Sequence, residues 1–101
     1  MTRGYRKAQN YPVDSIIGIY DNGGKTTDRY TVVYAPYTVN GRHFFPYVHM
    51  SGAPYWPQGV CMHGSTEGYR LTGGWGSSLG KVIAFDDLPA DCQRVAREDA
   101  A

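Results

Sequence analysis

The chain has 101 residues, a length that fits one domain with a single modest core and is too short for two. Hydrophobic residues make up 42% and charged residues 19%, which is typical of a globular and not of a disordered protein. Ten basic and nine acidic side chains give a net charge of +1, which argues against bulk electrostatic binding of nucleic acid or of an anionic membrane.

The sequence also indicates where the protein is expected to act. No apolar run approaches the roughly 20 residues of a membrane span, and no hydrophobic signal-peptide core follows Met1. Without an export signal, we expect a cytoplasmic protein in which Cys61 and Cys92 remain reduced thiols. Residues 1–14 are charged and lack a sustained hydrophobic period, so they predict a basic N-terminal arm before a single α+β domain over residues 15–101.

Residues 15–35 are the stretch on which the predicted sheet is built. Two runs rich in β-branched and aromatic residues, 16–20 and 29–34, flank an Asp-Asn-Gly-Gly break that begins at Asp21. Asn-Gly supplies the positive φ of a tight reversal, so the pattern predicts a β-hairpin whose polar, mobile tip extends to Asp28. The second run is apolar on both faces, as expected of a central strand.

A second hairpin is expected at Asn40-Gly41, a two-residue turn signal between strands at residues 37–39 and 43–50. Pro46 lies within the later of these strands. Because proline cannot donate to a strand ladder, it predicts an edge strand or a bulge at that point.

Residues 51–59, with the sequence Ser-Gly-Ala-Pro-Tyr-Trp-Pro-Gln-Gly, are predicted to form a rigid loop. Its two prolines fix φ and exclude both helix and ladder, and we expect the loop to present Tyr55 and Trp56 with at least one ring exposed to solvent.

The rest of the chain predicts short strands and one helix. We expect strands at residues 59–64 and 81–85, joined by a glycine-rich connection that is extended only around residues 69–72. Asp87 is the expected helix cap, with Pro89 in the first turn. An apolar stripe at helical spacing predicts that four residues pack against the sheet: Leu88, Cys92, Val95 and Ala96.

Two groups of residues were candidates for chemistry, and neither carries a complete signature. His49, Cys61 and His63 are of the types that bind zinc or form a nucleophile–base pair, but paired Cys-x-x-Cys spacing and a third orienting residue are absent. The glycine tract at residues 73–81 lacks the first glycine and the Ser or Thr of a phosphate-binding Walker A loop. We therefore predict no catalytic residue, no metal site and no cofactor.

The aromatic and arginine side chains of the loops are the remaining candidates for function. Such residues dominate the hot spots of protein interfaces, and they also stack on bases and nucleosides. A purely structural role in the core is the alternative. The candidate binding residues are Tyr37, Arg42, Tyr55, Trp56, Tyr69, Arg70 and Trp75.

Five short strings form a pattern along the chain: Tyr-Asp-Asn-Gly-Gly from Tyr20, Asp-Arg-Tyr-Thr-Val-Val from Asp28, Pro-Gln-Gly from Pro57, Leu-Gly-Lys from Leu79 and Asp-Leu-Pro-x-Asp-Cys-Gln from Asp87. This pattern resembles a group of small uncharacterised proteins encoded by tailed phages and prophages. The resemblance implies no catalytic residues, because the group has no assigned activity. It does imply a context in which small proteins often bind a host component, including inhibitors of defence systems such as CRISPR effectors.

The expected fold is α+β, a small twisted antiparallel sheet or open barrel of about five strands with one C-terminal helix. The expected function is that of a non-enzymatic phage accessory protein that binds a host protein complex in the bacterial cytoplasm, with anti-CRISPR-like inhibition as its sharpest form. One alternative is a binder of a small nucleotide or signalling ligand through stacked aromatics, glycine-loop amides and Arg29 or Arg70. Another is a metal- or thiol-dependent hydrolase. The oligomeric state is left open, a homodimer included.

Overall fold

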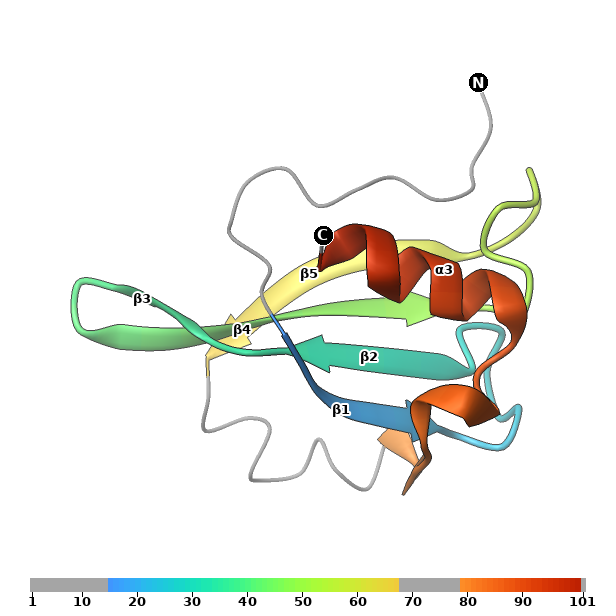
Figure 1. Cartoon of the computed structure of the whole chain (residues 1–101), viewed down its shortest axis with the longest axis horizontal. Helices are drawn as coiled ribbons and strands as arrows, with labels where there is room; N and C mark the ends of the chain where they lie inside the picture. Colours follow the sequence, from blue (N-terminus) through green and yellow to red (C-terminus); the bar gives the residue numbers. More distant parts are fainter. Residues whose placement is uncertain (1–14, 68–78, 101) are drawn as a thin grey trace.

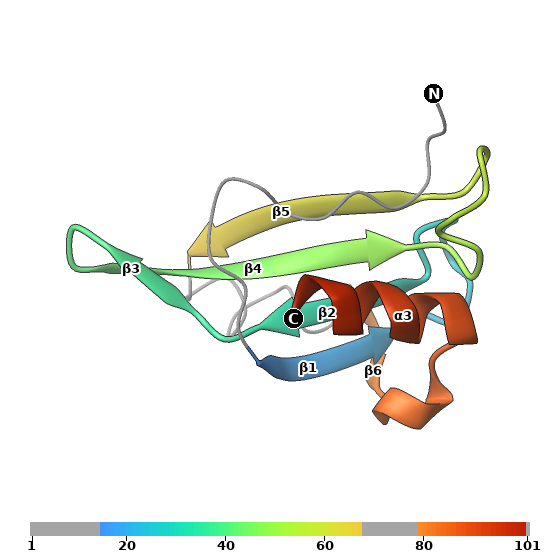
Figure 2. The same ribbon diagram turned by 45° about the horizontal axis from the view of Figure 1, so that its top comes forward.

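The computed structural model describes residues 15–67 and 79–100, which form an antiparallel sheet with one α-helix on it. Figure 1 and Figure 2 both place this helix, α3, against one face of the sheet. The α+β class is confirmed, and in this part of the chain the sheet is not closed into a barrel. The elements in chain order are β1 (Ile16–Asp21), β2 (Tyr30–Tyr34), β3 (Tyr37–Val39), β4 (Arg42–Met50), β5 (Cys61–Glu67), β6 (Lys81–Val82), the 3-10 turn η1 (Phe85–Asp87) and α3 (Ala90–Asp99).

Strand β4 is at the centre of the sheet. It pairs antiparallel with β5 along one side, and on the other side first with β3 and then with β2. Strand β2 pairs in turn with β1, and β1 with the two-residue strand β6. Side chains of residues paired across two strands share a face, so the register decides which of them meet α3.

The first predicted hairpin is confirmed by β1 and β2. All five residues of β2 are buried, as expected of a central strand. The tip, which we expected to be mobile, is braced by its own side chains. Asn22 Oδ1 accepts the N–H groups of Gly24 and Lys25 at 2.9 and 3.0 Å, and Thr26 Oγ1 donates to Asp28 at 2.6 Å.

The second predicted hairpin is confirmed by β3 and β4. Asn40 has a φ of 51° and Gly41 a φ of 77°, and two successive positive φ angles are those of the type I′ turn that Asn-Gly prefers. Because β4 is longer than β3 and β2 ends earlier, this hairpin projects beyond the rest of the sheet (Figure 1).

The prediction that Pro46 marks an edge strand is wrong, but the strand pairing on one side of β4 is interrupted at this residue. Strand β4 is paired on both sides, and Pro46 is buried opposite Ser65 of β5. On the other side β4 changes neighbour at this point, because Phe44 pairs with β3 and Tyr47 with β2. Within the described residues Pro46 has no partner in either of those two registers, so no backbone donor is needed there.

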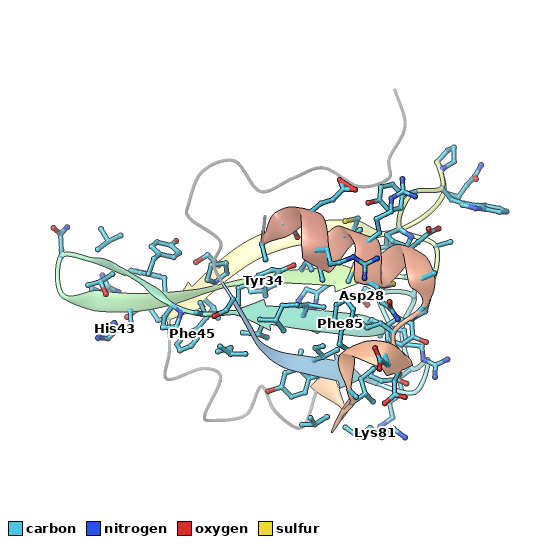
Figure 3. All side chains as sticks on the ribbon, in the orientation of Figure 1. Asp28, Tyr34, His43, Phe45, Lys81 and Phe85 are labelled. Atoms are coloured by element: carbon cyan, nitrogen blue, oxygen red, sulfur yellow. The ribbon has the colours of Figure 1, made fainter. Side chains whose placement is uncertain are left out.

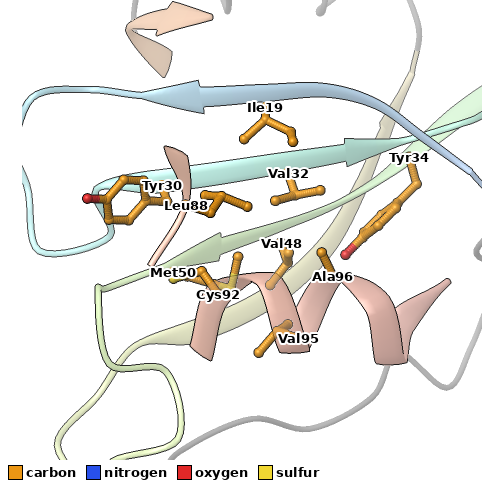
Figure 4. Close-up of a cluster of buried hydrophobic side chains, with 10 residues drawn as sticks. All are labelled: Ile19, Tyr30, Val32, Tyr34, Val48, Met50, Leu88, Cys92, Val95 and Ala96. Atoms are coloured by element: carbon orange, nitrogen blue, oxygen red, sulfur yellow. The ribbon is translucent and has the colours of Figure 1, made fainter. Parts of the chain in front are cut away.

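The core lies between the sheet and α3, as Figure 4 shows. Val32 and Val48 from the sheet and Val95 from the helix are fully buried. All four residues of the predicted apolar stripe are buried, but only Cys92, Val95 and Ala96 belong to α3, because Leu88 precedes the helix. The cluster consists of Ile19, Tyr30, Val32, Tyr34, Val48, Met50, Leu88, Cys92, Val95 and Ala96.

The boundaries before the helix differ from the prediction. Strand β6 ends at Val82, and Asp87 closes η1 instead of capping α3: its carboxylate accepts the Ala84 N–H at 3.1 Å. Pro89 is the N-cap residue of α3, with no side-chain cap bond. The reason lies at Leu88, which precedes a proline and therefore adopts an extended ψ of 145°, so that the helix cannot begin before Pro89.

Strand β5 starts later and runs further than the predicted strand at residues 59–64. Gly59 is excluded from it because its N–H donates to Trp56 O at 2.9 Å and closes a turn of the preceding loop. The extended piece expected around residues 69–72 and the N-terminal arm both lie outside the described residues.

Candidate functional site

The predicted binding residues are divided between the two ends of the sheet. Tyr37 and Arg42 lie on the β3–β4 hairpin, whereas Tyr55 and Trp56 lie beyond the far end of β4. A nine-residue strand rising roughly 3.3 Å per residue separates these ends by about 27 Å. Figure 3 shows the same division, with His43 at the hairpin end and Phe85 at the other. The remaining three candidates lie outside the described residues: Tyr69, Arg70 and Trp75.

At the hairpin end the candidate side chains are engaged with one another. The Tyr37 ring stacks on Phe44 with centroids 5.8 Å apart, and its hydroxyl lies 2.9 Å from Ser65 Oγ. The Arg42 guanidinium lies over the Phe44 ring and forms an ion pair with Glu67. These contacts use the polar groups within the fold, so the hairpin cluster is the weaker candidate for binding.

At the other end, the loop of residues 51–60 is closed and cross-braced. Ser51 and Val60 join its two sides, because the Ser51 N–H donates to Val60 O at 3.0 Å and the Val60 N–H donates to Ser51 Oγ at 3.0 Å. Inside it, the Trp56 N–H donates to Ala53 O at 3.2 Å. A Cβ on Gly59 would lie 2.0 Å from Ala53 O, so the tight return of the loop requires glycine.

The two aromatic rings of this loop have different environments. Trp56 is 64% exposed, which confirms the expectation that at least one ring faces solvent. Tyr55 is half-buried and packs against the edge of the core. Its hydroxyl donates to Glu98 at 3.1 Å, and the Arg94 guanidinium lies 4.3 Å from its ring centroid. Burial raises the pKa of Tyr55, and the bond to Glu98 adds to this, so the hydroxyl remains a donor.

The residues weighed for metal or thiol chemistry do not converge. In the β4–β5 register His63 is opposite Val48, whereas His49 is opposite Met62, so the two histidines lie on opposite faces of the sheet. Among residues 15–67 and 79–100 no group of three His, Cys, Asp or Glu side chains is arranged to hold a metal ion.

The second cysteine is an unreactive thiol. Burial raises the pKa of Cys92 to about 12, and its Sγ donates to Ser51 O at 3.2 Å. In the part of the chain that the structure describes, Cys61 and Cys92 are not joined by a disulfide.

A buried polar network that the sequence analysis missed lies beneath the C-terminal end of α3. Asp99 is buried, and its Oδ2 accepts the Tyr34 hydroxyl at 2.8 Å and lies 2.8 Å from His63 Nε2. The His63 side chain is only 13% exposed. The network joins α3 to β2 and β5. Its signal in the sequence was the position of Asp99, which follows Val95 by four residues and therefore extends the buried stripe.

On the opposite face of the sheet, His49 is held by two neighbours. Its Nδ1 lies 2.7 Å from Thr31 Oγ1, and its ring is 4.7 Å from that of Tyr47. Burial lowers the pKa of His49, which favours the neutral imidazole.

Arg29, proposed for the nucleotide-binding alternative, is held within the β1–β2 hairpin. Its Nε and Nη2 donate to the two carboxylate oxygens of Asp21 at 2.7 and 3.0 Å. This bond holds the pKa of Asp21 below its usual value, although partial burial opposes the shift. Asp21 therefore occupies the Nε–Nη2 edge of the guanidinium, and a phosphate would have to compete with it for bidentate bonds there.

Comparisons with known proteins give no further guide to the site. No protein-family model, no curated protein and no solved structure matches the chain. Among the described residues, no helix has the length and apolar character needed to cross a membrane.

Proposed function

We propose that this chain is a small phage accessory protein that acts by binding a host protein complex in the bacterial cytoplasm, with no chemical step of its own. The observation that carries the proposal is Trp56, a largely exposed indole at the end of a braced loop. Large exposed apolar side chains often mark interaction sites, and tryptophan is among the residues most enriched in hot spots.

The loop geometry supports binding because it limits the entropy lost on association. Pro54 is buried and fixes one side of the loop, while the nested turns at Ala53 and Trp56 fix the backbone that carries the indole. A side chain presented in this way needs little further ordering when it enters a partner.

The sharpest form of the proposal is inhibition of a host defence system, as an anti-CRISPR-like protein. It is supported by the resemblance of the sequence pattern to proteins of tailed phages. The ion pair of Arg29 with Asp21 argues against Arg29 as the ligand-binding arginine of the nucleotide-binding alternative. The opposite orientations of His49 and His63 speak against the hydrolase.

The test begins with the full chain as bait in host lysate, followed by mass spectrometry of what is retained. Affinity for the purified target is then measured for the parent and for Trp56→Ala. We expect Trp56→Ala to weaken binding by about 2 kcal/mol, or roughly 30-fold, while the melting temperature is unchanged.

Val39→Ala is the matched control, because Val39 is also an exposed apolar residue but lies at the hairpin end. It is expected to bind like the parent. Equal affinity of Trp56→Ala and the parent would contradict the proposal. A nucleotide retained by the purified protein in native mass spectrometry, with no host polypeptide captured, would favour the alternative.

A further inference from the structure

Two neighbouring arginines on the outer face of α3 are each supported by an aromatic ring. Arg94 lies over Tyr55 at 4.3 Å and Arg97 lies over Phe85 at 5.6 Å, measured from the guanidinium carbon to the ring centroid. Both rings are half-buried and pack against the core, so they are fixed platforms. Residues i and i+3 of a helix are neighbours whose Cβ atoms lie about 5–6 Å apart, so the two arginines start from the same side of α3 and each guanidinium then reaches its own ring.

The arginine pair, Arg94 and Arg97, is exposed and incompletely neutralised. The Arg94 side chain is 58% exposed, and its contact with Glu98 is a 3.6 Å surface pair between residues i and i+4, of the kind that contributes little energy. Arg97 is exposed and has no ion pair with a carboxylate among the described residues. A guanidinium stacked on a ring keeps its N–H edge available for bidentate bonds to an anionic oxygen pair.

The surroundings of the pair favour a carboxylate on a protein over a nucleic acid. Asp91 and Glu98 flank Arg94 on the same helix face. Double-stranded DNA carries one charge per roughly 1.7 Å, so phosphates could not avoid these carboxylates, whereas a polypeptide can place a single acidic side chain beside one arginine. The chain's net charge of +1 also gives nucleic acid no general attraction.

We propose that the arginine pair is the second half of the binding surface, and that it selects a partner segment with an acidic side chain beside the apolar group that receives Trp56. This inference rests on the proposed function, since it names the chemistry of the protein partner. Trp56 and Arg94 lie at the same end of the molecule, because Tyr55 contacts Arg94 and precedes Trp56 in the loop, and Arg97 follows Arg94 by three residues on α3.

The test is a selection of random short peptides displayed on phage, with the full chain as the immobilised target. We expect selected peptides to be enriched in Asp or Glu next to apolar residues. Arg97→Gln should weaken their binding by about tenfold, and Arg97→Lys should recover only part of it because the planar fork is lost. Lys25→Gln is the control, since it removes an equal charge from the exposed hairpin tip.

Glu98→Gln gives a test of opposite sign. The glutamine oxygen can still accept a hydrogen bond from the Tyr55 hydroxyl. The substitution removes the carboxylate that competes with an acidic peptide for Arg94, so acidic peptides are expected to bind more tightly. Circular dichroism verifies that each variant is folded. Because the substituted residues are exposed, we expect all of them to keep the fold.

The outcomes separate this inference from the proposed function. Selected peptides without acidic residues, unchanged affinity in Arg97→Gln, or a selection that gives no peptide dependent on the pair would each overturn it. Binding of labelled DNA or RNA oligonucleotides that Arg97→Gln abolishes would overturn it in favour of phosphate recognition. If Trp56→Ala leaves affinity unchanged while Arg97→Gln lowers it, the role of Trp56 fails and the arginine pair remains.

Discussion

At the scale of single residues, a few side chains and one glycine determine how the elements meet. Asp99 receives two donors beneath α3, Gly59 closes the loop that carries Trp56, and His49 is half-buried on the other face of the sheet. Each of the three has its importance because of the atoms that surround it in the folded chain.

Asp99→Ala is expected to destabilise the protein by about 2–4 kcal/mol. The change leaves the buried Tyr34 hydroxyl and the largely buried His63 imidazole without this acceptor, and a buried polar group that loses its partner carries its desolvation penalty. Urea unfolding gives the difference in free energy. Asp86→Asn, an exposed carboxylate change, should stay within about 0.5 kcal/mol of the parent; equal stability of Asp99→Ala would show that the network is dispensable.

Gly59→Ala should loosen the loop and cost about 1–3 kcal/mol, because the new Cβ would overlap Ala53 O. Gly52→Ala, in the same loop, is the matched control, since the nearest atom to its Cβ is 4.0 Å away. Amide exchange at Trp56 and Gly59 reports on the two turns. Slow exchange at both amides in Gly59→Ala would mean that the loop tolerates the side chain.

His49 predicts a pH dependence of stability with a definite sign. Burial lowers its pKa in the folded state below the ordinary 6.5, so the unfolded chain binds the proton more readily. The contribution of neutral His49 to the free energy of unfolding is present above pH 6.5. It is lost as pH falls from 6.5 through the folded-state pKa. Comparing His49→Asn with the parent by urea unfolding across this range should show the parent losing more stability on acidification; parallel curves would contradict the argument.

At the scale of elements, α3 is held to the sheet by its apolar stripe. A ten-residue helix is marginal alone, so its structure depends on burial of Cys92, Val95 and Ala96, with Leu88 buried just before it. Strands β1, β2 and β4 supply the buried side chains on which α3 packs.

Val95→Asp tests the packing of α3 directly. It places an unpaired charge at a fully buried position and should lower stability by several kcal/mol. Ala90→Asp introduces the same charge at an exposed site in the first turn, where the helix dipole favours it, and should be harmless. A Val95→Asp melt within about 2 °C of the parent would mean that the helix is not held by this contact.

At the scale of the whole molecule, the sheet separates candidate binding residues and candidate metal ligands that the sequence alone could not place apart. Nine residues of β4 place Tyr37 and Arg42 far from Tyr55 and Trp56, and strand alternation places His49 and His63 on opposite faces. Among residues 15–67 and 79–100, the Trp56 end is the one that combines an exposed indole with the arginines of α3.

The separation of the histidines predicts the metal content of the protein. Purified protein should contain zinc well below one equivalent, and a chelator should leave its melting curve unchanged, because His49 cannot join Cys61 and His63 in one coordination sphere. Elemental analysis measures the first quantity and a thermal melt the second. Stoichiometric zinc together with unfolding by the chelator would restore the metal-dependent alternative.

The sequence by itself determined what depends on local chemistry. Asn40-Gly41 specifies a turn because few residues adopt positive φ, the runs around it specify strands, and the spacing of Cys92, Val95 and Ala96 specifies the buried face of a helix. The exposure of one ring in the proline loop was predictable for the same reason.

Only the tertiary structure decided what depends on distant neighbours. Pro46 is interior because β4 changes partner beside it, Asp99 is satisfied by residues 65 and 36 positions away in the chain, and Arg97 faces solvent over Phe85 because η1 brings that ring beneath α3. Hydrogen bonds and ring contacts of this kind depend on register and helix docking. Those are set by the summed burial of the whole core, which short-range sequence patterns do not encode.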